Sequence, residues 1–264
     1  MLNKIDAGTQ EKLAKSLTAE STELLPFLPY LLQDIWELGS SPADMISLIR
    51  KHMVITENTR FLDLACGKGA VSIQLAREFN IKVKGIDIVP EFINYAVTRS
   101  IQMEVAALCK FSVGDIGQAV GSERNYDGVI YGAVGDVLGT PEDVILKLKD
   151  TLKPNGFIIY DDAYLKDATT SNVKFEHDYL TYEQWLTVFD KTGVQLIDRI
   201  VPNPDEENKN DENTRFIAIR AKELSVKYPA KRKLFESYVQ SQINECDDLE
   251  NSIVGVTWLL QAKK

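Results

Sequence analysis

The chain has 264 residues, of which 44% are hydrophobic and 26% are charged, and its formal net charge is −9. These values are typical of a globular protein with one large domain or a domain and a cap, and the negative charge argues against DNA or RNA as a partner because phosphate contacts need a basic face. No apolar stretch approaches the ~20 residues that span a bilayer, the N-terminus lacks an apolar secretory segment, and the cysteines show no metal-ligand spacing, so we expect a cytoplasmic protein with no metal and no membrane partner.

Residues 1–55 have the patterns of helices. The segment PYLLQDIWELGS, residues 29–40, has the pattern of an amphipathic helix that Gly39 ends. In the next segment, Ser41 is a predicted N-cap, Pro42 follows at the first helical position and Asp44 at the third. We therefore expect an N-terminal helical cap over residues 1–55.

Short strands and helices alternate in the next part of the chain. The apolar runs predict strands over residues 60–64, 81–86, 110–113, 126–131 and 156–161. The helical patterns cover residues 70–79, 90–108, 141–152 and 182–192. Strands that are apolar along nearly their whole length, alternating with helices, indicate a parallel sheet covered on both faces.

Two late strands complete the pattern, VQLIDRIV at residues 194–201 and GVTWLLQA at residues 255–262. The first should be parallel to its neighbours and the second antiparallel, so the segment between them leaves the sheet on the side where ligands bind. That segment has helical spacing over residues 214–249 and a break at Pro229. We expect the 202–254 insertion to be either a lid or an assembly element in a homodimer.

The first predicted strand leads into a loop of small residues, Asp63-x-Ala65-x-Gly67-x-Gly69. Small residues there let a ligand approach the backbone, but the G-x-G-x-x-G fingerprint of dinucleotide sites is absent. A carboxylate before the loop suits an ammonium group better than a pyrophosphate. Asp87 ends the second strand, where an acid accepts hydrogen bonds from ribose hydroxyls. A ligand with a ribose and an amino group, such as S-adenosylmethionine, has this make-up.

On these motifs the chain resembles the class I S-adenosylmethionine-dependent methyltransferase family. LDLACGKG resembles its first motif, GIDIVPEFINYA its ribose-binding loop, FSVGDI the segment after its third strand, and YDGVIYGAV and LKPNGFIIYDD its fourth and fifth strands. The resemblance covers about residues 58–200 and the last strand. It implies a Rossmann-like α/β fold with a seven-stranded, mostly parallel sheet, the last strand antiparallel and helices on both faces. It also implies cofactor contacts at Asp63, Ala65, Gly67, Gly69, Asp87, Ile88, Asp115, Ile116 and Tyr131.

In-line methyl transfer needs the two reactants held at attack distance, and a base only where the acceptor must lose a proton. Asp161 and Asp162, at the end of the fifth predicted strand, and His177 after it are the candidate catalytic residues.

Several of these residues have structural alternatives. Asp63 could bind loop amides, Asp115 could cap a short helix, and Asp161 or Asp162 could cap the loop that follows. His177 could be a surface residue.

The chain is therefore expected to comprise a 1–55 cap, a 56–201 cofactor-binding core, the 202–254 insertion and a 255–264 final strand. We expect a methyltransferase that acts on a small-molecule acceptor. A protein or peptide methyltransferase and a non-catalytic S-adenosylmethionine sensor are the alternatives, and a nucleotide-dependent oxidoreductase is less favoured without the dinucleotide fingerprint.

Overall fold

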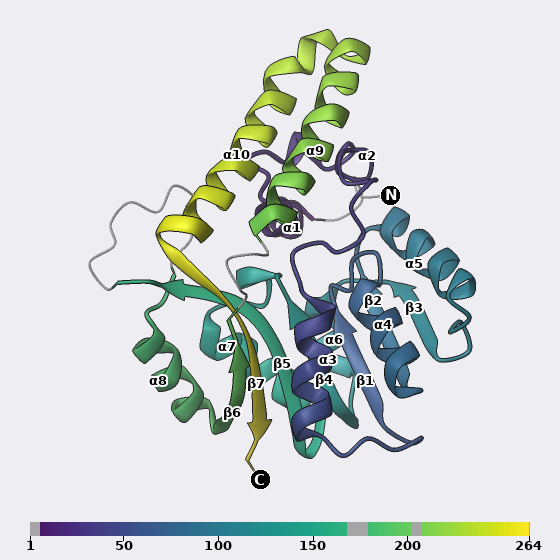
Figure 1. Cartoon of the computed structure of the whole chain (residues 1–264), viewed down its shortest axis with the longest axis vertical. Coiled ribbons are helices and arrows are strands. Elements are labelled where there is room, and N and C mark those ends of the chain that lie inside the picture. The colour runs from purple at the N-terminus through teal and green to yellow at the C-terminus, as the bar shows by residue number, and fades with distance from the viewer. Residues whose placement is uncertain (1–5, 168–178, 202–206, 264) are drawn as a thin grey trace. The chain divides into compact units, whose positions relative to one another are not determined.

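The computed structural model of the chain describes residues 6–167, 179–201 and 207–263 (Figure 1). These residues fall into two compact units. A sheet unit holds those of Trp36–Asp162, Glu183–Ile200 and Val256–Lys264, and a helical unit holds those of Met1–Ile35, Ala163–Tyr182 and Val201–Gly255.

Seven strands form one sheet in the order β3-β2-β1-β4-β5-β7-β6 (Figure 1). Neighbouring strands from β3 to β5 pair in parallel, and β7 pairs antiparallel with β6. The strands are β1 (Arg60–Leu64), β2 (Lys82–Asp87), β3 (Cys109–Val113), β4 (Tyr126–Gly132), β5 (Leu152–Leu165), β6 (Val194–Ile200) and β7 (Ile253–Ala262). The predicted seven-stranded sheet with an antiparallel last strand is confirmed.

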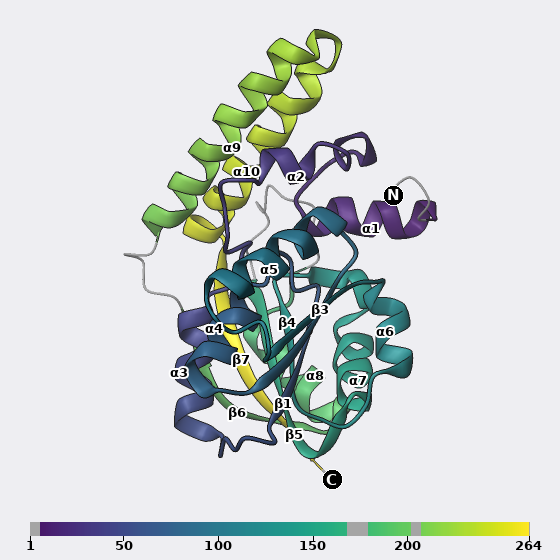
Figure 2. The same cartoon turned by 90° about the vertical axis from the view of Figure 1, so that its right-hand side faces the viewer.

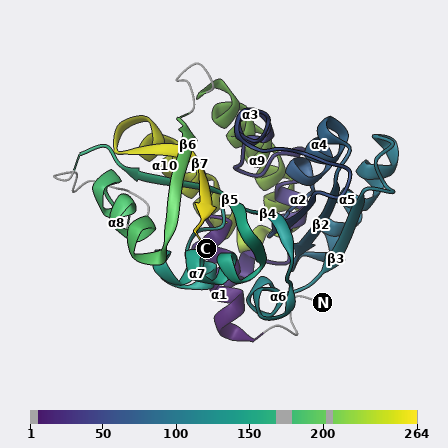
Figure 3. The same cartoon turned by 90° about the horizontal axis from the view of Figure 1, so that it is seen from below.

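Helices cover both faces of this sheet, as Figures 2 and 3 show. One face carries α3 (Pro42–His52), α4 (Ala70–Phe79) and α5 (Pro90–Gln102), and the other carries α6 (Ile116–Ser122), α7 (Pro141–Asp150) and α8 (Tyr182–Thr192). A short 3-10 helix, η3 (Gly135–Leu138), precedes α7. The predicted cap of α3 is confirmed, because Ser41 Oγ accepts a hydrogen bond from Asp44 N at 3.3 Å.

The core of the sheet unit consists of apolar side chains from the inner strands and from the helices that cover them. Phe61, Ile130, Ile159 and Leu259 come from four different strands and are buried in one apolar cluster with residues of α3 and α4. Burial of this kind supplies most of the stabilisation of a sheet covered on both faces.

The predicted helix over residues 29–40 is wrong for most of its length. The α-helix there, α2, covers only Leu28–Leu31, and Leu32 leaves the helical region with φ −96° and ψ 8°. The next side chains along the chain contact different partners. Asp34 binds Arg220 in the helical unit, and the Trp36 indole binds the Lys68 carbonyl in the sheet unit. These long-range contacts override the local helical pattern.

The helical unit contains a long hairpin. It consists of α9 (Glu207–Lys227), the 3-10 turn η5 (Pro229–Lys231) and α10 (Arg232–Asn251), so the predicted break at Pro229 is confirmed. With it belong α1 (Ala7–Ser16), η2 (Thr22–Leu24) and α2. The Phe27 ring packs edge-on against Phe235 at 5.1 Å and against Tyr228 at 5.4 Å between ring centroids. Over the described residues, no helix combines the length and the hydropathy that crossing a membrane requires.

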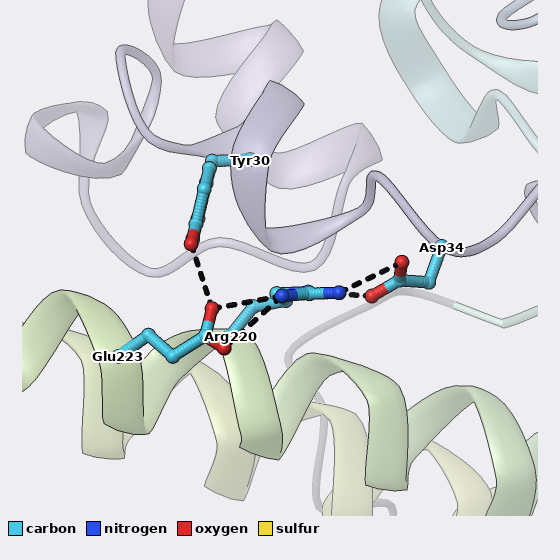
Figure 4. Close-up of polar contacts among 4 residues, drawn as sticks. All are labelled: Tyr30, Asp34, Arg220 and Glu223. Atoms are coloured by element: carbon cyan, nitrogen blue, oxygen red, sulfur yellow. Dashed lines mark hydrogen bonds and ion pairs between the residues drawn. The ribbon is translucent and has the colours of Figure 1, made fainter.

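Polar contacts also join α9 to the segment after α2 (Figure 4). The Arg220 guanidinium donates to both carboxylate oxygens of Asp34, at 2.6 and 3.0 Å, and to Glu223 on the next turn of α9. The Tyr30 hydroxyl donates to Glu223 at 2.6 Å. A bidentate guanidinium–carboxylate pair fixes direction as well as distance, so this cluster sets the path of the chain after α2 along α9.

Replacement of Leu259 by Ala should lower the free energy of unfolding by about 2–5 kcal/mol, because it leaves a cavity in the core. The matched control is Leu146→Ala on the exposed side of α7, which should change it by no more than about 0.5 kcal/mol. Urea unfolding followed by circular dichroism measures both. Equal losses in the two variants would contradict this account of the core.

Candidate functional site

The loop between β1 and α4 takes left-handed backbone conformations at alternate positions. The φ angles are +58° at Ala65, +52° at Gly67 and +74° at Gly69. Gly69 has no room for a side chain, since a Cβ there would lie 2.8 Å from the Ala96 Cβ. Ala65 holds its conformation at a cost of about 1–2 kcal/mol, so the surrounding contacts must impose it.

The carboxylate of Asp87 helps to hold the backbone of this loop in its left-handed conformation. It ends β2 and accepts hydrogen bonds from Gly67 N and from Val89 N, each at 2.8 Å. The residue is only 6% exposed, and burial raises the pKa of its carboxyl to about 6. One side chain thus connects the first loop to the turn that begins α5. Each carboxylate oxygen retains further acceptor capacity.

A second buried carboxylate, Asp63, lies at the end of β1. It is 3% exposed and accepts a hydrogen bond from the Ser72 hydroxyl at 2.6 Å. Burial raises the pKa of Asp63 to about 7, and the nearby Asp87 charge raises it further. Two carboxyl groups with raised pKa values near one loop favour a cationic group or hydroxyl donors there.

A small cavity of about 40 Å³ adjoins this loop. Its lining brings together the end of β1, the loop, the segment before α3 and the end of β4. The lining residues are Glu37, Leu38, Ser40, Asp63, Ala65, Cys66, Gly67, Lys68, Ala70, Val71, Ile130 and Gly132.

Several residues at this site were not predicted from the sequence, among them Ser40 and Lys68 of the cavity lining and Trp36, which contacts Lys68. The Trp36 indole donates to the Lys68 carbonyl at 3.2 Å. Lys68 is buried, with its ammonium 5.0 Å from the centre of the Tyr95 ring. The sequence around Lys68, a lysine between two glycines, does not show whether its side chain is buried or exposed. The contact of the loop with residues 36–40 joins segments that are distant in sequence, so no local pattern predicts it.

Asp161 connects to the cavity through Ser40. Its Oδ1 accepts a short hydrogen bond from the Thr257 hydroxyl, and Ser40 also hydrogen-bonds its carboxylate. Gly132, which lines the cavity, is the register partner of Asp161 on β4. Burial raises the pKa of Asp161 to about 6.

Asp162 faces different partners, because successive strand residues point to opposite sides of a sheet. Its Oδ2 accepts from the Tyr160 hydroxyl at 2.7 Å. The structure therefore brings Asp161, and not Asp162, to the cavity through Ser40. His177 lies outside the described residues.

The remaining predicted cofactor contacts are spread over three strand ends. Ile88 follows β2, and Ile116 is the buried first residue of α6. Asp115 caps α6 by accepting from Gly117 N at 2.7 Å, so its alternative structural role is confirmed. Tyr131 is buried and donates to the Gly135 carbonyl at 3.0 Å. Since Ile130 and Gly132 line the cavity, Tyr131 points to the other face of the sheet.

No group of three or more histidine, cysteine, aspartate or glutamate residues that could hold a metal ion is found among the described residues.

Comparison with known proteins gives one family. A family model described as a methyltransferase domain matches residues 55–222. The chain is 32% identical over 111 residues to YqeM of Bacillus subtilis, a match that covers 40% of the chain and 43% of that protein. It is 26% identical over 167 residues to phosphoethanolamine N-methyltransferase 1 of Arabidopsis thaliana, with 56% of the chain and 31% of that protein covered. The match therefore spans less than half the length of either relative.

The fold has close counterparts among solved structures. A SAM-dependent methyltransferase from Thiobacillus denitrificans, in complex with S-adenosyl-L-homocysteine, superposes with a TM-score of 0.75 at 18% identity. The match covers 90% of this chain and 98% of that one. At this identity the likeness establishes the fold.

Replacement of Asp63 by Asn should flatten the pH dependence of stability. The pKa of Asp63 is about 7 in the folded chain against an ordinary 3.8, so its protonated form stabilises the fold fully below about pH 4, and this stabilisation is lost as the pH rises through about 7. Between these limits it contributes a fall of about 1.4 kcal/mol per pH unit in the free energy of unfolding.

Urea unfolding at pH 5, 6 and 7 measures this slope for the wild type and for Asp63→Asn. Asp190→Asn, at an exposed position of α8, is the matched control and should keep the wild-type slope. A slope that is the same in all three proteins would show that Asp63 is ionised throughout this range.

Proposed function

The chain belongs to the methyltransferase-domain family, and from that premise we propose that it transfers a methyl group from S-adenosylmethionine to a small-molecule acceptor. The observation that carries the proposal is the pair of buried carboxyl groups, Asp63 and Asp87, on either side of a loop with left-handed backbone at Ala65, Gly67 and Gly69.

The chemistry of these groups fits S-adenosylmethionine. The cofactor carries an ammonium and a sulfonium, which suit carboxyls whose ionised forms burial disfavours. Asp87 retains acceptor capacity for ribose hydroxyls beside its two backbone bonds. A pyrophosphate, in contrast, would be repelled by both carboxylates, so a dinucleotide fits less well. The cofactor contacts at Asp63, Ala65, Gly67, Gly69, Asp87, Ile88, Asp115 and Ile116 are part of this proposal. Tyr131 remains a predicted contact with weaker support because it points to the other face of the sheet.

S-adenosylmethionine, when bound, supplies a methyl group on a positively charged sulfur. The task of the chain is then to orient the reactants and to exclude water. Where the acceptor is a hydroxyl or an ammonium, a base must also remove a proton, and Asp161 is the best-placed candidate. Its pKa of about 6 leaves the carboxylate mostly ionised at neutral pH but basic enough to accept a proton. Asp162 and His177 remain candidates with less support.

A small acceptor is supported by two observations. The Arabidopsis relative is a phosphoethanolamine N-methyltransferase, which by its name acts on a small amino alcohol phosphate. The cavity at the loop is small and is lined by residues of β1, β4 and the segment before α3. The 202–254 insertion stays a predicted lid or assembly element.

Asp87→Ala should weaken binding of S-adenosylmethionine by about 1.5–3 kcal/mol, the range for hydrogen bonds to a charged group. Isothermal titration calorimetry measures this, with circular dichroism to show that the variant is folded. Asp190→Ala, at an exposed site, should bind as the wild type does. Unchanged affinity in a folded Asp87→Ala protein would remove Asp87 from the site.

Gly67→Val should abolish the thermal stabilisation that S-adenosylmethionine confers. Valine strains the left-handed backbone there, and its Cβ would lie 3.3 Å from the Leu38 side chain, which also lines the cavity. Gly121→Val on α6 is the control, since a Cβ there has open space. Melting temperatures with and without ligand decide the outcome. NAD and NADP should give no shift, and a clear shift with either would favour an oxidoreductase.

Asp161→Asn should lower kcat by about 10²–10⁴-fold for an acceptor that must lose a proton, with cofactor affinity kept. Asp162→Asn is the matched variant, and we expect a smaller effect. Methyl transfer to a panel of metabolites, with peptides included, measures both. A protein that binds the cofactor but methylates nothing in the panel would support the sensor alternative, and an unchanged kcat in Asp161→Asn would exclude it as the base.

A further inference from the structure

The tip of the helical hairpin, residues 226–233, has a composition opposite to that of the rest of the chain. Its sequence, VKYPAKRK, contains four basic residues and no acidic one, in a chain with 39 acidic and 30 basic residues. It comprises the end of α9, the turn η5 and the start of α10 (Figures 1 and 2). The hairpin thus concentrates positive charge at its turn.

Part of this positive charge is not neutralised locally. Lys231 pairs with Glu23 at 2.6 Å, and Arg232 pairs with Glu236 at 2.7 Å. Lys227 and Lys233 are exposed and form no ion pair with any described residue. Lys222, one turn before Val226 on α9, is exposed in the same way. These three ammonium groups are available to an anionic partner.

Apolar side chains lie among these lysines. Val226 is 78% exposed and Ile219, two turns earlier on α9, is 53% exposed. Residues at i and i+7 lie on one helix face, so Ile219, Lys222 and Val226 form one exposed strip. Exposure of the apolar Val226 side chain to water does not stabilise the folded chain, and the lysines beside it form no ion pair with a described residue.

Hydrogen bonds and ring contacts define the turn at the tip. Tyr228 N donates to the Leu224 carbonyl at 2.7 Å, and Lys231 N donates to the Tyr228 carbonyl at 2.9 Å. The Tyr228 ring packs against Phe27, and the Lys227 ammonium lies 5.5 Å from the centre of that ring. These contacts fix the backbone of the turn, so binding has to order only its exposed side chains.

We propose that this hairpin tip binds an anionic lipid surface. Lysines attract acidic headgroups, Val226 enters the boundary between headgroups and acyl chains, and the Tyr228 ring suits the interface, where amphipathic rings concentrate. The proposal concerns surface contact only and replaces the expectation of no membrane partner. It does not rest on the proposed enzymatic function.

A nucleic acid fits the tip less well. Binding to a single strand uses several aromatic rings as stacking platforms for successive bases, whereas the tip VKYPAKRK contains one aromatic residue, Tyr228. An exposed valine contributes nothing to phosphate contacts.

Flotation of the full chain with vesicles tests the proposal. We expect binding to phosphatidylcholine vesicles that contain 30% phosphatidylserine, little binding to phosphatidylcholine alone, and loss of binding at high salt. Lys227→Gln with Lys233→Gln should lower the partition coefficient about 25-fold, since each lysine near such a surface is worth about fivefold. The matched control is Lys82→Gln with Lys110→Gln, two exposed lysines of the sheet unit, and it should bind as the wild type does.

Val226→Asp provides a second, independent variant and should reduce binding at least as strongly. Its control is Val54→Asp, because Val54 is 92% exposed in the sheet unit. Equal binding to neutral and anionic vesicles, or equal losses in tip and control variants, would overturn the proposal. So would a tip-dependent dimer seen by light scattering without lipid, or tighter tip-dependent binding to a single-stranded oligonucleotide than to vesicles at the same salt.

Discussion

The hydrogen bonds from Gly67 N and Val89 N to the Asp87 carboxylate hold the candidate site together. They connect the loop after β1 with the turn after β2, which are adjacent at the carboxyl edge of the sheet. Without this shared acceptor, two buried N–H groups would lack partners, and each would cost about 1–3 kcal/mol. This carboxylate accepts from the amide of Gly67, and the Cys66 amide donates to the Ile86 carbonyl at 3.1 Å, so two backbone contacts hold the left-handed segment at Ala65 and Gly67.

This arrangement has an electrostatic consequence for the site. Asp63, Asp87 and Asp161 are carboxyl groups whose pKa values burial raises to about 7, 6 and 6. A folded chain that keeps such groups loses stability as the pH rises, so the ionised forms of these carboxyl groups are unfavourable to the fold even though each of them accepts hydrogen bonds. A ligand that brings positive charge and hydroxyl donors would offset this cost, which is the basis of the proposed methyl transfer from S-adenosylmethionine.

Both units bury apolar side chains, and each adds polar or aromatic contacts of its own. The sheet unit depends on apolar burial between strands and helices, with its polar groups at strand ends. The helical unit also buries apolar side chains, among them Leu28, Leu31 and Phe235. It adds the edge-on aromatic contacts of Phe27 and the Arg220 cluster, which connect residues near the N-terminus to α9 and α10.

The strands, their order along the chain, the antiparallel last strand and the break at Pro229 could all be predicted from the sequence, because periodicity, proline and turn residues act over a few positions. The glycine loop and Asp87 were predicted as a site for the same reason, since each follows directly from a strand end. Only the tertiary structure shows that residues 32–40 leave the helix, that Ser40 connects Asp161 to the cavity, and that Lys68 is buried beside Tyr95. These features depend on residues that are distant in sequence, and no local pattern records which of them will meet when the apolar faces are buried together.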